Sequence, residues 1–294
     1  MAKKKGGLRS LIPRPVKRVI LGARYLYHRA TSPIRVLPDY ICIGTQKGGT
    51  SSFFYNLAQH PCVGRAFYKE VDFFDNNFQK GLGWYRTFFP TVLTKWYHTR
   101  LRGRRFVTGE ASTYYMMHPL AAKRAASVLP HLKVIVFLRN PIDRAYSHWN
   151  RYHISGMEPL SLEEAIDKEP ERLKGEFEKL LADETYFSYN HWHYGYLERG
   201  LYVKQVPAWM EAFPREQIRV YASEDYRDRP AEILADALKF LGLPPMTSPP
   251  REEHNVGGYR ETMDPRTRAR LVEFFRPYNA RLYDYLGRRF DWDK

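Results

Sequence analysis

Two apolar patterns alternate along this chain from residue 40 onward. Short runs rich in β-branched and aromatic residues predict strands at 40–43, 105–108, 133–138 and 218–221. Stretches with apolar residues at helical spacing predict helices that start near residue 51 and near residue 141, and at 121–129, 201–213, 230–241 and 265–286. Strands that alternate with helices indicate a parallel sheet covered on both faces. The pattern predicts an α/β fold, a single domain with a central parallel sheet, over residues 37–294.

Three segments between these elements are less regular. Residues 64–99 show no clear periodicity, and residues 158–185 are charged and helical in pattern, with Pro170 as an expected interruption. We expect residues 158–185 to form a solvated helical insertion over the mouth of a ligand site. Residues 223–225 read as a turn, and a loop rich in Pro, Gly and charge runs to Arg260.

The N-terminal segment, residues 1–36, differs from the rest in charge. Residues 1–35 hold ten Lys or Arg and no acid, out of 47 Lys and Arg and 32 Asp and Glu in the whole chain, whose net charge is +15. The remainder is therefore only mildly basic. A helix over Val16–Ala30 would gather Val16, Val19, Ile20, Ala23 and Tyr27 on one face.

This predicted helix has two interpretations. A short basic amphipathic helix suits an anionic membrane surface or an acidic partner. It can also pack on the domain with its arginines in solvent, and this is the interpretation that we favour. The chain has no apolar run of about 18 residues that could span a bilayer, and the segment is too charged for a secretory signal peptide.

Cysteine content bears on the compartment and on metal binding. The two cysteines, Cys42 and Cys62, form no CxxC pair. We therefore expect no metal site and a reducing, cytoplasmic location, with peripheral membrane contact as an option.

A small-residue loop with one cation, Thr45–Thr50 (TQKGGT), separates the first strand from the first helix of the domain. Glycines let successive backbone N–H groups turn toward one point, and the following helix N-terminus, which Ser51 or Ser52 can cap, adds partial positive charge. Such a loop cradles a phosphate. It is not a Walker loop, because its lysine, Lys47, precedes the glycine pair instead of following it. By itself the loop is equally compatible with a turn that binds no ligand.

A second phosphate grip follows the strongest strand, KVIVFL at residues 133–138. Arg139 stands at the carboxyl end of this strand, where α/β sheets bind ligands, and Ser147 lies about two turns into the next helix. A guanidinium and a hydroxyl so placed can hold one phosphate together. Taken alone, Arg139 could instead pair with Asp143 or Glu110.

These two motifs, in this order and on these elements, resemble those of the sulfotransferases that use 3′-phosphoadenosine 5′-phosphosulfate (PAPS), especially the carbohydrate (heparan-sulfate-type) branch and its bacterial relatives. The resemblance runs from Asp39 to the C-terminus. It implies a P-loop-like phosphosulfate loop and a 3′-phosphate site made by Arg139 and Ser147. It further implies a basic loop over the cofactor, to which Gly258, Tyr259 and Arg260 are loosely similar. The residues of the phosphosulfate loop would be Lys47, Gly48, Gly49, Thr50, Ser51 and Ser52.

The resemblance also implies a catalytic base. KEVDFFD at residues 69–75 is similar to a segment whose glutamate deprotonates the acceptor hydroxyl, which points to Glu70, while Lys47 would assist the leaving oxygen. An ion pair with Lys69 is the alternative role for Glu70. His118, His148 and His153 are weaker candidates for the base.

Two departures from the family pattern bear on the acceptor. Ala111 replaces a lysine, and Asp72 replaces a histidine. A glycan hydroxyl or amine is the expected acceptor, and a lipid or small-molecule alcohol stays open. Because both changes remove a cation near the reacting groups, they affect the acceptor more than the reaction.

Two other classes of function fit parts of the sequence. A basic protein with interleaved aromatics can bind nucleic acid, but most of the excess charge lies in residues 1–35 and no nucleic-acid motif is present. We therefore expect no nucleic-acid partner. A P-loop kinase would need the lysine in a different place.

Overall fold

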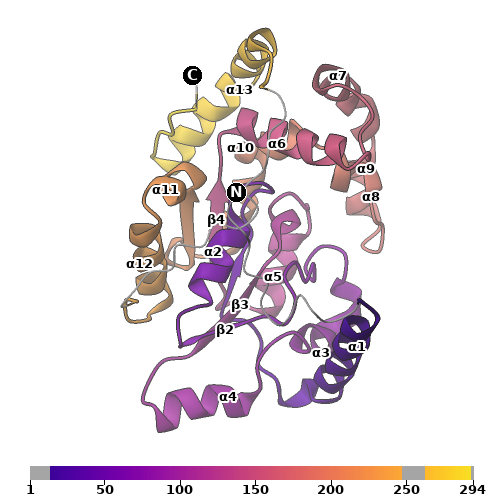
Figure 1. The fold of residues 1–294 in the computed structure, drawn as a ribbon. Helices are drawn as coiled ribbons and strands as arrows, with labels where there is room; N and C mark the ends of the chain where they lie inside the picture. The colour runs from indigo at the N-terminus through magenta and orange to yellow at the C-terminus, as the bar shows by residue number, and fades with distance from the viewer. Residues whose placement is uncertain (1–13, 247–261, 293–294) are drawn as a thin grey trace, which may run out of the picture.

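The computed structural model describes residues 14–246 and 262–292. Its centre is a five-stranded, all-parallel sheet with the strand order β2-β3-β1-β4-β5 (Figure 1). The predicted α/β fold with a central parallel sheet is confirmed. The strands are β1 (Tyr40–Cys42), β2 (Val63–Arg65), β3 (Val107–Ala111), β4 (Lys133–Leu138) and β5 (Ile218–Ala222).

Helices cover both faces of the sheet. This burial on both sides explains the long apolar run of β4. Val134, Val136 and Leu138 face a core shared with α5 (Ala121–Val128) and α10 (Tyr202–Ala212). Ile135 and Phe137 face a second core, shared with α2 (Thr50–Leu57) and α12 (Pro230–Leu241). Successive strand residues point to opposite faces, so a strand buried on both sides needs a continuous apolar run.

The helices follow the chain in this order: α1 (Arg14–Ala30), α2 (Thr50–Leu57), α3 (Gly81–Arg86), α4 (Val92–Trp96), α5 (Ala121–Val128), α6 (Pro141–Ile154), α7 (Leu162–Leu173), α8 (Glu176–Ala182), α9 (Tyr189–His193), α10 (Tyr202–Ala212), α11 (Ser223–Asp228), α12 (Pro230–Leu241) and α13 (Pro265–Leu286). Short 3₁₀ turns join several of them, and a π-helical turn, Tyr97–Leu101, extends α4.

The structure corrects four sequence-based boundaries. The three-residue edge strand β2 was not predicted, because a strand this short carries no periodicity. The predicted strand at 105–108 is β3 and runs over Val107–Ala111. Residues 223–225 begin helix α11 instead of forming a turn.

The fourth correction concerns Pro170. It does not interrupt α7, which continues to Leu173; the break comes at Gly175, whose φ of 73° suits glycine. A capping box between Ser161 and Glu164, together with the buried face of the helix, offsets the hydrogen bond that proline removes.

Helix α1 packs on the domain, but not through the predicted apolar face. Tyr25 contacts the main core, the His28 ring lies 4.7 Å from the Phe67 ring, and His28 Nδ1 lies 2.9 Å from the Thr87 carbonyl oxygen. The predicted face, which includes Val19 and Ile20, is exposed.

Candidate active site

The loop after β1 has the backbone shape of an anion cradle. Gly49 has a φ of 80° and caps α2, which begins at Thr50 without a side-chain cap. A Cβ at Gly48 would lie 2.8 Å from the Thr45 carbonyl oxygen, so only glycine fits this turn. Ser51 and Ser52 therefore lie inside the first turn of the helix, and the prediction that one of them is the N-cap is wrong. Gly49 occupies the N-cap position instead.

The two predicted phosphate motifs meet in space. The Arg139 guanidinium, from the end of β4, donates through Nη1 to the carbonyl oxygen of Lys47 at 2.8 Å. Ser223, at the start of α11, donates to the Gly48 carbonyl oxygen at 2.6 Å. Two chain segments, the end of β4 and the start of α11, thus hold the loop at the carboxyl edge of the sheet, where parallel strands bind ligands.

The rest of the Arg139 motif adopts the predicted elements. The Asn140 side chain caps α6 by accepting from the Ile142 backbone N–H at 3.0 Å, and Ser147 is buried two turns into that helix. Asp143, one of the alternative partners considered for Arg139, lies 2.8 Å from Arg268. The predicted covering loop, Gly258, Tyr259 and Arg260, lies outside the described residues.

Backbone strain gathers at this edge. Among the described residues, the non-glycine residues with positive φ are Lys47 at 69°, Glu70 at 61° and Asp72 at 52°. This left-handed conformation disfavours residues with a Cβ, and such residues cluster at functional sites. The Glu70 N–H donates to the Ala111 carbonyl oxygen at 3.0 Å, which fixes the strained segment to the end of β3.

The Glu70 side chain reaches solvent. The side chain is 43% exposed, and its carboxylate lies 3.0 Å from Nζ of Lys69, whose side chain is only 12% exposed. The Thr113 hydroxyl donates to the same oxygen at 3.4 Å. The ion pair that the sequence left open therefore forms, and it leaves the carboxylate accessible to an acceptor.

Behind Glu70 lies a group of buried acids. Burial, together with the neighbouring Glu70 and Glu110 carboxylates, raises the pKa of Asp72 to about 7. Burial also raises the pKa of Asp75 and of Glu110. Glu110 accepts from the Tyr85 and Tyr115 hydroxyls at 3.0 and 2.6 Å, so it is part of the core and is unsuited to be a base.

The histidines named as weaker candidates are placed for packing. His118 is buried and its pKa is lowered to about 3, chiefly by burial. His148 is fully buried between the Tyr152 and Tyr196 rings, and burial lowers its pKa. His153 is exposed and lies 3.0 Å from the Glu158 carbonyl oxygen. Glu70 and His153 are therefore the accessible groups among these candidates, and the His153 ring is stacked on Trp149.

Sequence reasoning missed a buried cation beside the loop. Arg199 is 3% exposed and donates through Nη1 to Gln46 Oε1 at 3.4 Å and through Nη2 to the backbone carbonyls of His191 and Trp192. Its guanidinium also lies 5.2 Å from the Tyr114 ring centre. No described carboxylate lies within ion-pair distance of it, and its Nε has no hydrogen-bond partner.

Residues 158–185, for which the sequence predicts a solvated insertion over the ligand site, support the segment that carries Arg199. Glu169 of α7 accepts from the backbone N–H groups of Leu197 and Glu198 at 2.7 and 2.8 Å. Glu158 is buried and accepts from the Tyr196 hydroxyl at 2.9 Å. The only sequence signal for Arg199 was an arginine just before the predicted helix at 201–213, which is too weak to single it out.

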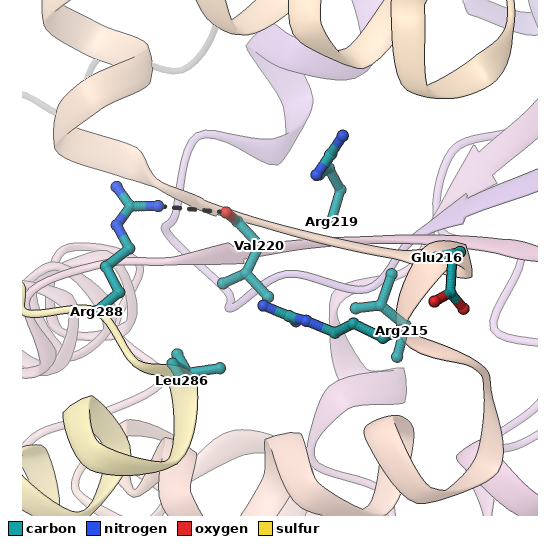
Figure 2. A pocket seen from close by; sticks show the side chains of 7 residues that line it. Arg215, Glu216, Arg219, Val220, Leu286 and Arg288 are labelled. Atoms are coloured by element: carbon teal, nitrogen blue, oxygen red, sulfur yellow. Dashed lines mark hydrogen bonds between the residues drawn. The ribbon is translucent and has the colours of Figure 1, made fainter.

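A pocket lies apart from this edge of the sheet, and two other kinds of feature, a metal site and a membrane-spanning helix, concern the described residues as a whole. A pocket of about 460 Å³ lies at the amino end of β5, lined by Arg215, Arg219 and Arg288, and Arg288 donates to the Val220 carbonyl oxygen at 3.4 Å (Figure 2). Within residues 14–246 and 262–292, no group of three His, Cys, Asp or Glu side chains is arranged to hold a metal ion. Nor does this part of the chain contain a helix that is both long and apolar enough to cross a bilayer.

Comparisons with known proteins agree with this geometry. A crystal structure of a sulfotransferase from Alicyclobacillus acidocaldarius superimposes with a TM-score of 0.64 and 29% identity, covering 88% of this chain and all of that one. The chain is 26% identical over 321 residues to the membrane-associated sulfotransferase kil1 of Dictyostelium discoideum, covering 87% of this chain and 66% of that protein.

Two heparan sulfate enzymes are also similar. The chain is 31% identical to the bifunctional heparan sulfate N-deacetylase/N-sulfotransferase 1 of Caenorhabditis briggsae, covering 71% of this chain and 23% of that protein. It is 27% identical to the heparan sulfate glucosamine 3-O-sulfotransferase 5 of Mus musculus, covering 88% and 75%. The chain thus spans two thirds or less of the length of the first curated relatives it matches. Residues 37–277 match the sulfotransferase domain, and the chain therefore belongs to the sulfotransferase domain family, a family of enzymes.

Proposed function

We propose that this protein transfers a sulfuryl group from PAPS to a hydroxyl or amine of an acceptor. The observation that carries the proposal is the Arg139–Lys47 contact, which joins the two phosphate motifs into one site. A donor with both a 5′-phosphosulfate and a 3′-phosphate matches a site with two separate anion grips. A donor with a triphosphate would need the lysine on the other side of the glycines.

The residues fit the donor chemically. The backbone N–H groups at the start of α2 carry no side-chain cap, which suits them to an anion, and the Gly48–Gly49 turn brings the backbone close to it. Lys47 is the cation for the bridging oxygen, and Arg139 with Ser147 would hold the 3′-phosphate. The donor would supply the sulfur electrophile and a stable leaving group.

Transfer needs alignment and charge stabilisation more than covalent chemistry by the protein. As the acceptor oxygen bonds to sulfur, the bond from sulfur to the bridging oxygen breaks and adenosine 3′,5′-bisphosphate leaves. Glu70 takes the proton from the acceptor hydroxyl, and Lys47 stabilises the negative charge on the bridging oxygen. The strained φ values of both residues support this assignment, because the fold maintains them at a cost.

Arg199 adds a second cation to this proposal. A buried guanidinium with only neutral acceptors around it is costly, and an anion beside it would reduce that cost. Arg199 contacts Gln46, the neighbour of Lys47, and Glu70 is among the acids whose charge acts on it. We assign Arg199 to the sulfuryl oxygens, which carry negative charge throughout the transfer.

A carbohydrate is the acceptor that we favour. Two of the relatives act on heparan sulfate, as their names state. Half-exposed aromatic rings also lie near Arg199: Tyr189 stacks on His193 at 4.0 Å, and the Phe187 and Trp192 rings are 5.7 Å apart. Such rings offer flat apolar surfaces for a sugar ring or for the chain of a lipid alcohol. A lipid or small-molecule alcohol is the second candidate.

Mass spectrometry after incubation with PAPS tests both parts of the proposal. The candidate acceptors are an unsulfated glycosaminoglycan, its partly N-deacetylated form, a sugar monomer and a long-chain alcohol. We expect the mass of one sulfuryl group on a glycan, and its position separates O- from N-transfer. Transfer to the alcohol alone would replace the carbohydrate assignment. A product formed from ATP and magnesium, with none from PAPS, would overturn the reaction class.

A further inference from the structure

The chain exposes many large apolar side chains in two places. Among the residues that the structure describes, twenty-one large hydrophobic side chains are exposed, of which six lie between Val16 and Tyr27 and five between Val92 and Leu101. The first group belongs to α1 and the second to α4 and its π-helical turn. Neither α4 nor this turn contains a buried residue. The exposed residues are Val16, Val19, Ile20, Leu21, Leu26 and Tyr27 in the first group, and Val92, Leu93, Trp96, Tyr97 and Leu101 in the second.

The two groups start from one point of the fold. Arg35, shortly after α1, forms an antiparallel bridge with Thr91, the residue before α4, and the Val36 N–H donates to the Pro90 carbonyl oxygen at 3.0 Å. Both helices lie at the lower end of the molecule in the view of Figure 1, away from α13. The exposed apolar residues of these two helices, at this end of the molecule, are together called the α1/α4 surface.

Each helix is fixed to the domain by another face. Tyr25 and His28 hold α1, as described above, while Lys95 of α4 pairs with Asp39 at 3.0 Å and the His98 ring stacks on Phe106 at 4.7 Å. Helical spacing places Val16, Val19, Ile20 and Tyr27 on the side of α1 opposite Tyr25. Their exposure thus follows from how the helix packs, and it is not a sign of a loose helix.

The sequence segments that contain the two helices are basic. Residues 1–38 and 76–109 together hold 17 of the 47 Lys and Arg and none of the 32 Asp and Glu. The remaining sequence has 30 bases against 32 acids and is nearly neutral. Arg100, within the π-helical turn that extends α4, and Arg102 and Arg104, just after it, are exposed. Basic groups around an exposed apolar and aromatic patch are the signature of a helix that lies in a membrane interface.

We propose that the α1/α4 surface binds an anionic lipid bilayer, with the apolar side chains in the headgroup region and the arginines on the lipid phosphates. Trp96 and Tyr97 suit this depth, because their rings combine an apolar body with a polar edge. Nucleic acid would use the arginines and the aromatic rings but would give no reason to expose Val19, Ile20 and Leu93. The proposal is independent of the transfer reaction.

Vesicle sedimentation tests the proposal with the full chain. We expect binding to phosphatidylcholine vesicles that contain phosphatidylglycerol, little binding to pure phosphatidylcholine, and weaker binding as salt rises. Leu93→Ser/Trp96→Ser and Val19→Ser/Ile20→Ser should each lower the partition coefficient at least tenfold. Phe177→Ser/Leu181→Ser, on α8, makes a similar chemical change at exposed residues elsewhere and should bind like the unchanged protein.

Thermal melting and calorimetry with adenosine 3′,5′-bisphosphate check that the variants keep their fold and their nucleotide site. If the α1 and α4 variants bind vesicles like the unchanged protein, or if the α8 variant loses as much, the surface assignment is wrong. Salt-sensitive binding to double-stranded DNA without vesicle binding would replace the bilayer by a nucleic acid. Equal binding to neutral and anionic vesicles would show that the arginines do not contribute to binding, which would contradict the proposal.

Discussion

Lys69 and Glu70 form an ion pair in which the lysine is mostly buried and the carboxylate is half in solvent. The two side chains lie 3.0 Å apart on consecutive residues, and Glu70 has the left-handed φ of 61°. The unusual backbone turns the carboxylate outward while the lysine stays beneath it. The carboxylate is thus placed where an acceptor hydroxyl can reach it, which a general base requires.

Replacement of Glu70 tests this role. Glu70→Gln keeps the size of the side chain but removes its basicity, so turnover should fall by about 10²- to 10⁴-fold. Binding of adenosine 3′,5′-bisphosphate, measured by calorimetry, should change little, because Glu70 does not belong to either phosphate grip. Activity retained within a few-fold, or a loss confined to nucleotide affinity, would contradict the assignment.

Replacement of Arg139 tests the second phosphate grip. The unchanged protein should bind adenosine 3′,5′-bisphosphate much more tightly than adenosine 5′-phosphate. Arg139→Ala should weaken the first by about 1.5 to 3 kcal/mol, the usual value of a hydrogen bond to a charged group. Arg215→Ala, which removes an exposed arginine at the other end of the sheet, is the control. Equal affinity of the unchanged protein for both nucleotides would refute the motif.

Replacement of Arg199 separates catalysis from nucleotide binding. Arg199→Met should lower turnover by about 10²- to 10³-fold, as the loss of one preorganised charge-stabilising group does elsewhere. The product nucleotide carries no sulfuryl group, so its affinity should be nearly unchanged. Arg199→Lys should recover part of the turnover. If Arg199→Met loses nucleotide affinity and melting temperature together and lysine restores neither, Arg199 only supports the fold.

Asp72 makes stability depend on pH. Its pKa rises from 3.8 to about 7 on folding, so between these values the folded state binds more protons than the unfolded state. Its contribution therefore lowers stability as pH rises through this range. Asp72→Asn removes the effect, and its advantage in melting temperature over the unchanged protein should be larger at about pH 8 than at about pH 5. An advantage that is the same at both values would show that Asp72 does not titrate there.

Two deletions distinguish the contribution of residues 1–13 from that of helix α1. Removal of residues 1–13 should leave turnover on a soluble acceptor and the melting temperature nearly unchanged, because no candidate site residue lies there. Removal of residues 1–35 should lower the melting temperature, since it uncovers Phe67 and removes the buried Arg35, which donates to the Phe89 carbonyl oxygen at 2.6 Å. A melting temperature that stays the same after the longer deletion would show that α1 contributes no stability.

The sequence by itself determined the fold class and the two phosphate motifs. The run at 133–138, the glycine pair before Thr50 and the Arg139–Ser147 spacing are local patterns, and local backbone preferences and strand burial suffice to read them. For the same reason the bounds of β4, α12 and α13 agree with the predicted ranges.

Only the tertiary structure decided which groups meet. Arg139 and Lys47 are 92 residues apart, and Arg199 and Gln46 are 153 apart, so no local pattern pairs them. The burial that raises the pKa of Asp72 and excludes His118, His148 and Glu110 as accessible bases depends on several elements packing together. The outward apolar face of α1 likewise depends on which side of the helix contacts Phe67 and Phe88. Periodicity identifies an apolar face, but only packing decides whether the domain covers it.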